Sequence, residues 1–176
     1  FHSGYGHTAR VAEAVAEGAG GALLPISAEG ELPEGGWERL AAAKAIIFGT
    51  PTYMGGPSWQ FKRFADASSK PWYSRVWQDK LAGGFTNSAS MNGDKGMTMA
   101  YLATLAGQHG MLWVSLGMLP SNAKASTRAD VNALGGSLGA LATSPSDSAP
   151  AEMFDGDLET ARRYGARIAA LAAARG

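Results

Sequence analysis

The sequence predicts an α/β fold with a doubly wound, five-stranded parallel sheet. Two observations predict it. Short continuous apolar runs alternate along the chain with stretches whose apolar residues recur at helical spacing. Runs such as 44–49 also have no polar face, which is typical of strands that helices cover on both sides. No repeat or linker divides the 176 residues, so we expect a single domain over 1–176.

The same patterns place the elements along the chain. Strands are expected at 22–26, 44–49, 81–86 and 111–116. Helices are expected at 8–18, at 37–43, from Pro57 onward, along 97–109 and at 157–175. The buried stripe of the fourth helix is predicted to comprise Met97, Tyr101, Leu102, Leu105 and Ala106. Residues 117–156 have little periodicity, so we expect a long irregular segment there.

The stretch 3–8 combines small residues with hydroxyls and directly precedes the first helix. Gly4 and Gly6 let the backbone turn tightly, and the helix start offers N–H groups and a positive dipole end to an anion. The loop holds no lysine and lacks the Gly-Lys-Ser/Thr ending of a triphosphate loop, so the expected ligand is a phosphomonoester. A polar turn capped by Ser3 or Thr8 is the alternative. Because such a loop normally follows a buried strand, we expect a further strand before Phe1.

Composition excludes several classes of function. Lys and Arg total 15, as do Asp and Glu, so no strong field is available to hold nucleic acid or an anionic membrane. The chain has no cysteine, which excludes disulfides and thiolate chemistry, and His2, His7 and His109 have no metal-ligand spacing. No apolar run approaches membrane-spanning length. We therefore expect a cytoplasmic protein without a metal, a membrane or a nucleic-acid partner.

Two further loops follow predicted strands, at 50–56 and 87–93. Both combine small residues, hydroxyls and exposed backbone, and Tyr53 and Met54 would present apolar surface to a ring. In a parallel sheet, loops at the carboxyl ends of the strands meet at one edge, where ligands bind. Together with the stretch 3–8, these loops favour a nucleotide with a phosphate at one end and a ring at the other.

At this point the sequence resembles a known family. The stretches FHSGYGHTARVAEAVAEGA, AIIFGTPTYMGGPSWQFKRFADA and TNSASMNGDKG are similar to the flavodoxin-like superfamily and, within it, to the Wrb-type NAD(P)H:quinone oxidoreductases, also called tryptophan-repressor-binding proteins. The resemblance implies that FMN is the cofactor. In the matching positions, the phosphate is held by Ser3, Gly4, Tyr5, Gly6, His7 and Thr8; the ring lies along Pro51, Thr52, Tyr53, Met54 and Gly55; and ring and ribityl contact Ser88, Ala89, Ser90, Asn92 and Gly93.

The resemblance also implies an activity. It predicts ping-pong transfer of two electrons from NAD(P)H through FMN to a quinone, in a homo-oligomer that is a dimer or a tetramer. Tyr5 matches a position associated with the nicotinamide nucleotide, and Trp72 matches an aromatic that borders the substrate site. His109 is the candidate catalytic and flavin-pocket residue, which in the family often comes from a neighbouring subunit. Two alternatives remain open: a flavodoxin-type electron carrier, and a flavin-binding regulatory relative with little activity, because the third loop lacks the family's glycine-rich pattern.

Overall fold

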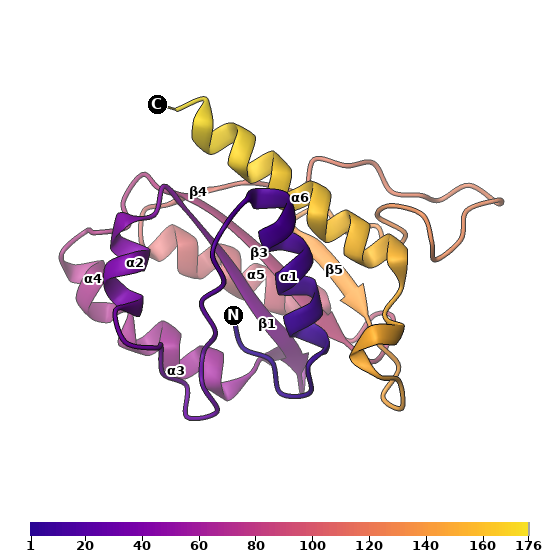
Figure 1. The fold of residues 1–176 in the computed structure, drawn as a ribbon, viewed down its shortest axis with the longest axis horizontal. Coiled ribbons are helices and arrows are strands. Elements are labelled where there is room, and N and C mark those ends of the chain that lie inside the picture. The colour runs from indigo at the N-terminus through magenta and orange to yellow at the C-terminus, as the bar shows by residue number, and fades with distance from the viewer. Residues whose placement is uncertain (176) are drawn as a thin grey trace.

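A five-stranded sheet with helices on both faces organises residues 1–175, which the computed structural model describes (Figure 1). The strands are β1 (Ala45–Tyr53), β2 (Gly56–Pro57), β3 (Leu81–Ser88), β4 (Leu112–Trp113) and β5 (Ala140–Thr143). The helices are α1 (His7–Ala19), α2 (Gly36–Ala42), α3 (Trp59–Ala67), α4 (Ser69–Tyr73), α5 (Lys95–Gln108) and α6 (Asp155–Ala173), with a 3₁₀ turn, η1, at Pro150–Glu152.

The central pairing of the sheet is parallel, as the sequence predicts, but the sheet is not parallel throughout. β3 pairs in parallel with β1 on one side and, on its other side, first with β4 and then with β5. The exception is β2, which pairs antiparallel with β1 as the second arm of a tight hairpin. The prediction of a wholly parallel sheet is therefore corrected at this edge, where a turn at Met54 and Gly55 reverses the chain.

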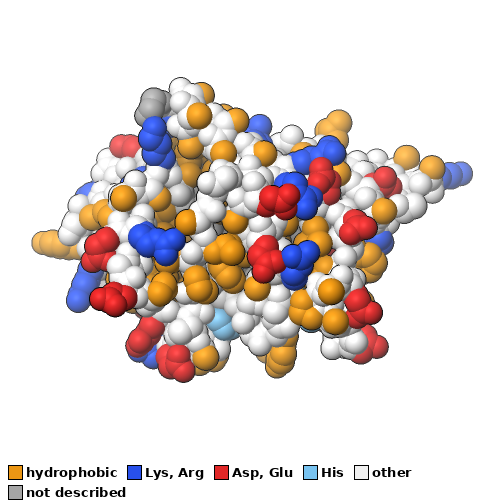
Figure 2. Space-filling view, in the orientation of Figure 1, with side chains coloured by type: hydrophobic (Ala, Val, Ile, Leu, Met, Phe, Trp, Pro, Cys, Tyr) orange, Lys and Arg blue, Asp and Glu red, His pale blue; other side chains and the backbone are white. Residues whose placement is uncertain are grey.

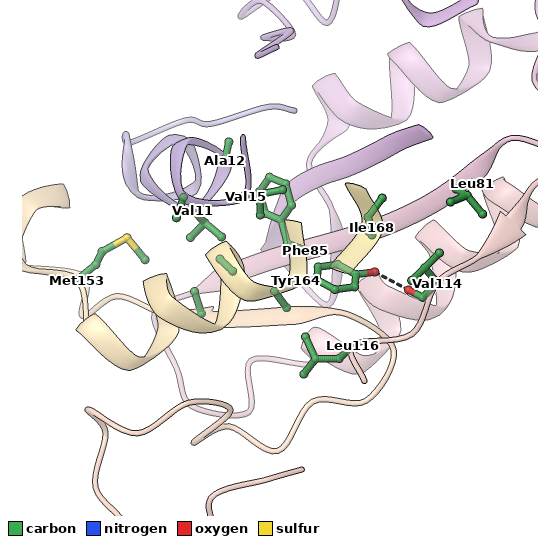
Figure 3. Close-up of a cluster of buried hydrophobic side chains, with 14 residues drawn as sticks. Val11, Ala12, Val15, Leu81, Phe85, Val114, Leu116, Met153, Tyr164 and Ile168 are labelled. Atoms are coloured by element: carbon green, nitrogen blue, oxygen red, sulfur yellow. Dashed lines mark hydrogen bonds between the residues drawn. The ribbon is translucent and has the colours of Figure 1, made fainter. Parts of the chain in front are cut away.

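One face of the sheet is covered by α1 and α6, which lie in front of it in Figure 1. The two helices approach closely because Gly18 of α1 and Gly165 of α6 each lie against the backbone of the other helix. A Cβ on Gly18 would clash with the Arg162 carbonyl oxygen, and one on Gly165 would clash with the Val15 carbonyl oxygen. Beneath them Tyr164 donates a hydrogen bond to the Val114 carbonyl oxygen at 2.6 Å, at the centre of a buried aliphatic cluster (Figure 3). This layer fixes the start of α1 against the sheet.

The opposite face is packed with aromatic side chains. Trp77 has no exposed surface and its ring is tilted against Phe48, while Trp37 stacks on Phe64 with ring centroids 5.5 Å apart. α5 packs over β3 on this side. Trp77 is therefore a core residue of this layer.

Three of the predicted elements are wrong in detail. Residues 22–26 form no strand, although Leu24 and Ile26 exchange backbone hydrogen bonds with Phe1. The run 111–116 is regular only over β4, and β5 takes the remaining length of β3. β5 lies inside the segment expected to be irregular, because Ala140–Thr143 is too short to show periodicity.

The predicted stripe of α5 is wrong in part. Leu102 and Ala106 are buried, but Met97 is 65 % exposed, and the buried face instead includes Met99 and Lys95. A charged side chain at a buried position gives no apolar signal, so the stripe could not be placed from periodicity alone.

A cavity of about 480 Å³ lies beside the first half of β1. Its walls include Phe1, Leu24, Ile46, Phe61 and Leu40. It runs alongside the part of β1 that precedes the loops discussed below.

Candidate active site

The structure brings the three predicted loops to one edge of the sheet. β1 and β3 run in parallel with Thr50 opposite Thr86 and Pro51 opposite Asn87, so the second and third loops leave neighbouring strands together. The first loop joins them because the His2 N–H donates to the Gly49 carbonyl oxygen at 3.0 Å. In Figure 1 the start of α1 and the arrowheads of β1 and β5 all lie at the lower edge of the molecule.

The first loop, 3–8, is shaped as an anion-binding turn. Gly6 has a φ of 90°, a left-handed conformation that favours glycine, and it immediately precedes α1. The Ser3 hydroxyl oxygen accepts the N–H groups of Gly6 and Ala9, each at 3.1 Å, so Ser3 caps the helix start. The N–H groups of His7 and Thr8 precede the first intrahelical bond, so they are available to an anion at the helix start. Capping by Ser3 and phosphate binding are therefore compatible in one loop.

Neutral groups line this turn. The nearest cation along the chain, Arg10, is paired with Glu13 at 2.6 Å on the helix surface. The His7 ring Nε2 lies 2.9 Å from the Ser148 carbonyl oxygen, which ties the turn to the segment after β5. A phosphate here would be held by N–H and hydroxyl donors, which suits a phosphomonoester.

The second loop is the tip of the β1–β2 hairpin. Tyr53 pairs with Gly56, and Met54 and Gly55 have φ values of 48° and 79° at the turn. Met54 is fully exposed, and Tyr53 is 38 % exposed with its ring edge-to-face with Tyr5, at a centroid distance of 6.3 Å. The pKa of Tyr53 is raised, mainly by partial burial and to a lesser extent by the neighbouring Tyr5, so its hydroxyl is protonated at neutral pH. Together these side chains make an apolar wall beside the phosphate loop.

Buried hydroxyls fix the base of this hairpin. Thr52 Oγ1 lies 2.8 Å from the hydroxyls of both Thr86 and Thr98, and Thr86 donates to the Thr50 carbonyl oxygen at 2.7 Å. On the other side Ser58 Oγ lies 2.9 Å from His2 Nδ1. The second loop is thus bonded to β3, to α5 and to the first loop, which gives a rigid platform between them.

The third loop, 87–93, is held by contacts from the segment after β5 and from the start of α5. Asn87 donates to the Ser144 hydroxyl at 2.8 Å, and the Ser144 N–H donates to the Ser88 carbonyl oxygen at 3.2 Å. The side chain of Lys95 donates to the carbonyl oxygens of Ser90 and Met91 at 2.6 and 3.1 Å. Of the residues expected at the ring and ribityl in this loop, Ala89, Ser90 and Asn92 are exposed, Gly93 is half-buried and Ser88 is buried.

Sequence reasoning missed two parts of this edge. The segment 144–149, after β5, is a fourth loop beside the first and third, through Ser144 and Ser148. The second part is the set of charges behind the third loop: Lys95 and Asp157, which are buried, and Arg128, which is half-buried. Asp157 accepts Arg128 at 2.5 Å and the Thr143 N–H at 2.9 Å. The sequence offers one weak signal for these residues: none of them has an oppositely charged neighbour at helical spacing.

Two predicted site residues lie away from the three loops within one chain. His109, at the end of α5, is 3 % exposed, with Nε2 2.9 Å from the Ser68 hydroxyl and its ring 4.2 Å from that of Trp77. Burial lowers the pKa of His109. Trp72 is 42 % exposed on α4, which lies at the left of Figure 1, far from the start of α1. The role of Trp72 at the substrate site and that of His109 at the flavin of a neighbouring subunit stay predictions.

The fold and the loops define a flavodoxin-like protein, and comparison with known proteins gives the family. Residues 34–125 match the family described as NADPH-dependent FMN reductase. The chain is 57 % identical to Flavodoxin FldP of Pseudomonas aeruginosa, across 96 % of this chain and 92 % of that protein. It is 33 % identical to an NAD(P)H dehydrogenase (quinone) of Geobacter sulfurreducens, across 98 % and 95 %.

A solved structure agrees with these relatives. The crystal structure described as the flavodoxin, WrbA-like protein from Agrobacterium tumefaciens superposes with a TM-score of 0.83 at 59 % identity, covering 99 % of this chain and 95 % of that one. The chain therefore belongs to the NADPH-dependent FMN reductase family and has its flavodoxin-like fold. The resemblance stated from the sequence is confirmed, and family membership implies FMN as cofactor and NAD(P)H as donor.

The residues at the loop edge fit FMN. The turn at 3–8 offers donors but no cation, which suits a single phosphate, and the exposed wall of Tyr5, Tyr53 and Met54 suits a flat ring. The third loop leaves the N–H groups of Met91 and Asn92 without an acceptor among the described residues, as the heteroatoms of a flavin ring require. Across residues 1–175 no group of His, Asp or Glu side chains is placed to hold a metal ion. No helix in that range is long and apolar enough to cross a membrane.

Proposed function

We propose that the chain is an FMN-dependent oxidoreductase that passes two electrons from NAD(P)H to a quinone by a ping-pong mechanism. The observation that carries the proposal is the open apolar wall beside the phosphate loop. Tyr5 is 78 % exposed and Met54 is fully exposed, so a second flat molecule has surface to lie against. Relatives named NAD(P)H dehydrogenase (quinone) match almost the full chain.

The bound flavin would supply the redox chemistry, accepting a hydride and returning electrons to an acceptor. The chain's own residues bind and orient. The turn at 3–8 would hold the phosphate, and the rigid hairpin would fix the ring plane through the hydroxyls under Thr52. An exposed wall lets a nicotinamide leave and a quinone take the same place. No side chain at this edge is needed as a general acid, because the quinone oxygens can take protons from water.

A homo-oligomer is part of this proposal. Trp72, Tyr73 and Val76 are exposed apolar side chains on and after α4. Association through this surface would bury them and is the route by which Trp72 could border a substrate site in a neighbouring subunit. Light scattering after size exclusion, with a Tyr73→Glu variant as comparison, tests it: the assembly should dissociate in the variant.

The second candidate is an electron carrier, which the name of FldP favours at 57 % identity. Carriers of this kind dock on partners through a charged face. Here basic and acidic residues balance, and Figure 2 shows them interspersed on the visible face. The charge pattern therefore favours the reductase.

An anaerobic titration separates the two candidates. Protein reconstituted with FMN is titrated with NADH and, separately, with NADPH, and benzoquinone is then added. Bleaching of the flavin band by either nucleotide and its return with benzoquinone support the reductase. A bound flavin that neither nucleotide bleaches would contradict it and support the carrier. A protein that takes up no FMN would contradict both.

A further inference from the structure

Lys95 is a buried lysine for which the proposed function has no use. It is the first residue of α5 and is 2 % exposed. Removing an ammonium group from water is costly unless hydrogen bonds or an opposite charge replace the water. Burial accordingly lowers the pKa of Lys95 to about 8. A side chain that costs stability in this way needs another reason to be there.

The partners of Lys95 are backbone carbonyls of the third loop. Its ammonium donates to the Ser90 oxygen at 2.6 Å and to the Met91 oxygen at 3.1 Å. No carboxylate lies within salt-bridge distance of it in the described part of the chain. Asp157, which attracts it at longer range, is bonded to Arg128 and to the Thr143 N–H. The charge of Lys95 is thus directed at the loop.

This geometry orients two N–H groups. In a planar trans peptide the C=O and the N–H of one unit point in opposite directions. Because Lys95 draws the carbonyls of Ser90 and Met91 inward, the N–H groups of Met91 and Asn92 point outward. Neither N–H has an acceptor within the described residues. Both residues are exposed at the edge that holds the other two loops.

We propose that Lys95 is a positioning residue for the flavin ring: it holds the third loop so that the Met91 and Asn92 N–H groups face the ring's acceptor atoms. The inference rests on the FMN binding in the proposed function but not on the quinone reaction. It assigns Lys95 to the ring end of the cofactor and leaves the phosphate end to the turn at 3–8. A ligand without the phosphate should therefore depend on Lys95 as strongly as FMN does.

The test compares Lys95→Met and Lys95→Gln with the wild type. The matched control is Lys124→Met, since Lys124 is an exposed lysine far along the chain from the three loops. Apo-proteins are titrated with FMN and with riboflavin, following quenching of flavin fluorescence. Loss of two charge-assisted hydrogen bonds should weaken binding of both flavins about tenfold in Lys95→Met, and less in Lys95→Gln. Lys124→Met should bind as the wild type does.

A second readout needs no flavin. Hydrogen exchange of the amides of residues 95 and 144 in the apo-proteins reports on the loop alone, because these amides donate to the Asn92 and Ser88 carbonyl oxygens; exchange should be faster in Lys95→Met while amides of β3 keep their protection. Circular dichroism confirms that each variant is folded, and Lys95→Gln carries the test should Lys95→Met not fold.

Two results would overturn the inference: unchanged affinity for both flavins in a folded Lys95 variant, or weaker binding of FMN with unchanged binding of riboflavin. Failure of the proposed function looks different. In that case the wild-type protein would bind FMN, but NAD(P)H would not bleach the flavin band. The ratio of flavin affinities between wild type and variant would still report on Lys95.

Discussion

The phosphate loop and the third loop share one edge of the sheet, but the chain builds them in different ways. The phosphate loop is held mainly by its own neighbours, since Ser3 accepts the N–H groups of Gly6 and Ala9. The third loop is held from other elements, through Ser144 and through Lys95 at the start of α5, whose charge is attracted by Asp157 of α6. The phosphate loop is held by neutral donors and acceptors, whereas the third loop depends on a buried charge.

This difference predicts how strongly substitutions in or behind each loop affect stability and flavin binding. Neutral caps contribute modestly and can be replaced by water or by the ligand itself. Buried charges contribute through their partners, so removal of one leaves another uncompensated. Changes behind the third loop should therefore have larger effects, and should depend on pH, whereas changes in the phosphate loop should be smaller and independent of pH.

The largest effect is expected from Asp157→Ala. The substitution leaves Arg128 without its carboxylate and the Thr143 N–H without its acceptor. Breaking a buried pair costs about 3–5 kcal/mol, and the partial exposure of Arg128 places this one near about 3 kcal/mol. Urea unfolding of the apo-protein measures the loss. The exposed pair of Arg162 and Glu159 is the control: Arg162→Ala should cost below about 1 kcal/mol. Equal losses would contradict the contrast between the loops.

The second effect concerns pH. Folding lowers the pKa of Lys95 from 10.5 to about 8, so between these values the unfolded chain binds a proton that the folded chain releases. The free energy of unfolding should therefore rise with pH in this window, with a slope of at most about 1.4 kcal/mol per pH unit. Urea unfolding between about pH 7 and about pH 9.5 measures it. Lys95→Met should lack the rise, and an equal rise in both proteins would refute the assignment. Ser3→Ala should retain it.

The same contrast explains how much the sequence predicts. The phosphate loop and the start of α1 are encoded in adjacent residues, so glycine positions and apolar runs were sufficient to predict them. The loop at 50–56 was also predicted, but the antiparallel pairing of β2 with β1 was not. β5 was missed because its four residues carry no period of their own and are defined by pairing with β3. Lys95 was missed for a related reason: its function depends on where Ser90 and Met91 carbonyls lie, which is set by contacts that the local sequence does not show.

A third, smaller effect is expected from Gly6→Ala. Gly6 has a φ of 90°, and a Cβ there would lie 2.9 Å from Pro150 Cγ. The left-handed conformation alone costs a residue with a Cβ about 1–2 kcal/mol. Because the strain lies in the phosphate loop, affinity for FMN should fall about tenfold, whereas affinity for riboflavin should change less. Gly20→Ala is the control, since Gly20 has a φ of 58° with open space around it. A loss of FMN affinity in that control would show that strain at either end of α1 is sufficient.

The smallest effect is expected from Ser3→Ala. The substitution removes the acceptor of the Gly6 and Ala9 N–H groups and should lower the free energy of unfolding by about 1 kcal/mol. Ser27→Ala is the matched control, because the Ser27 hydroxyl also accepts two N–H groups, those of Glu29 and Glu31, but in an exposed loop where water replaces it. Urea unfolding with and without FMN makes the comparison decisive. A bound phosphate can accept the N–H groups that Ser3 releases, so the loss should shrink in the FMN complex. No ligand atom can replace the Lys95 ammonium beneath the third loop, so FMN should not compensate for the effect of Lys95→Met. A Ser3→Ala loss that is as large with FMN as without it would place the phosphate elsewhere than at this turn.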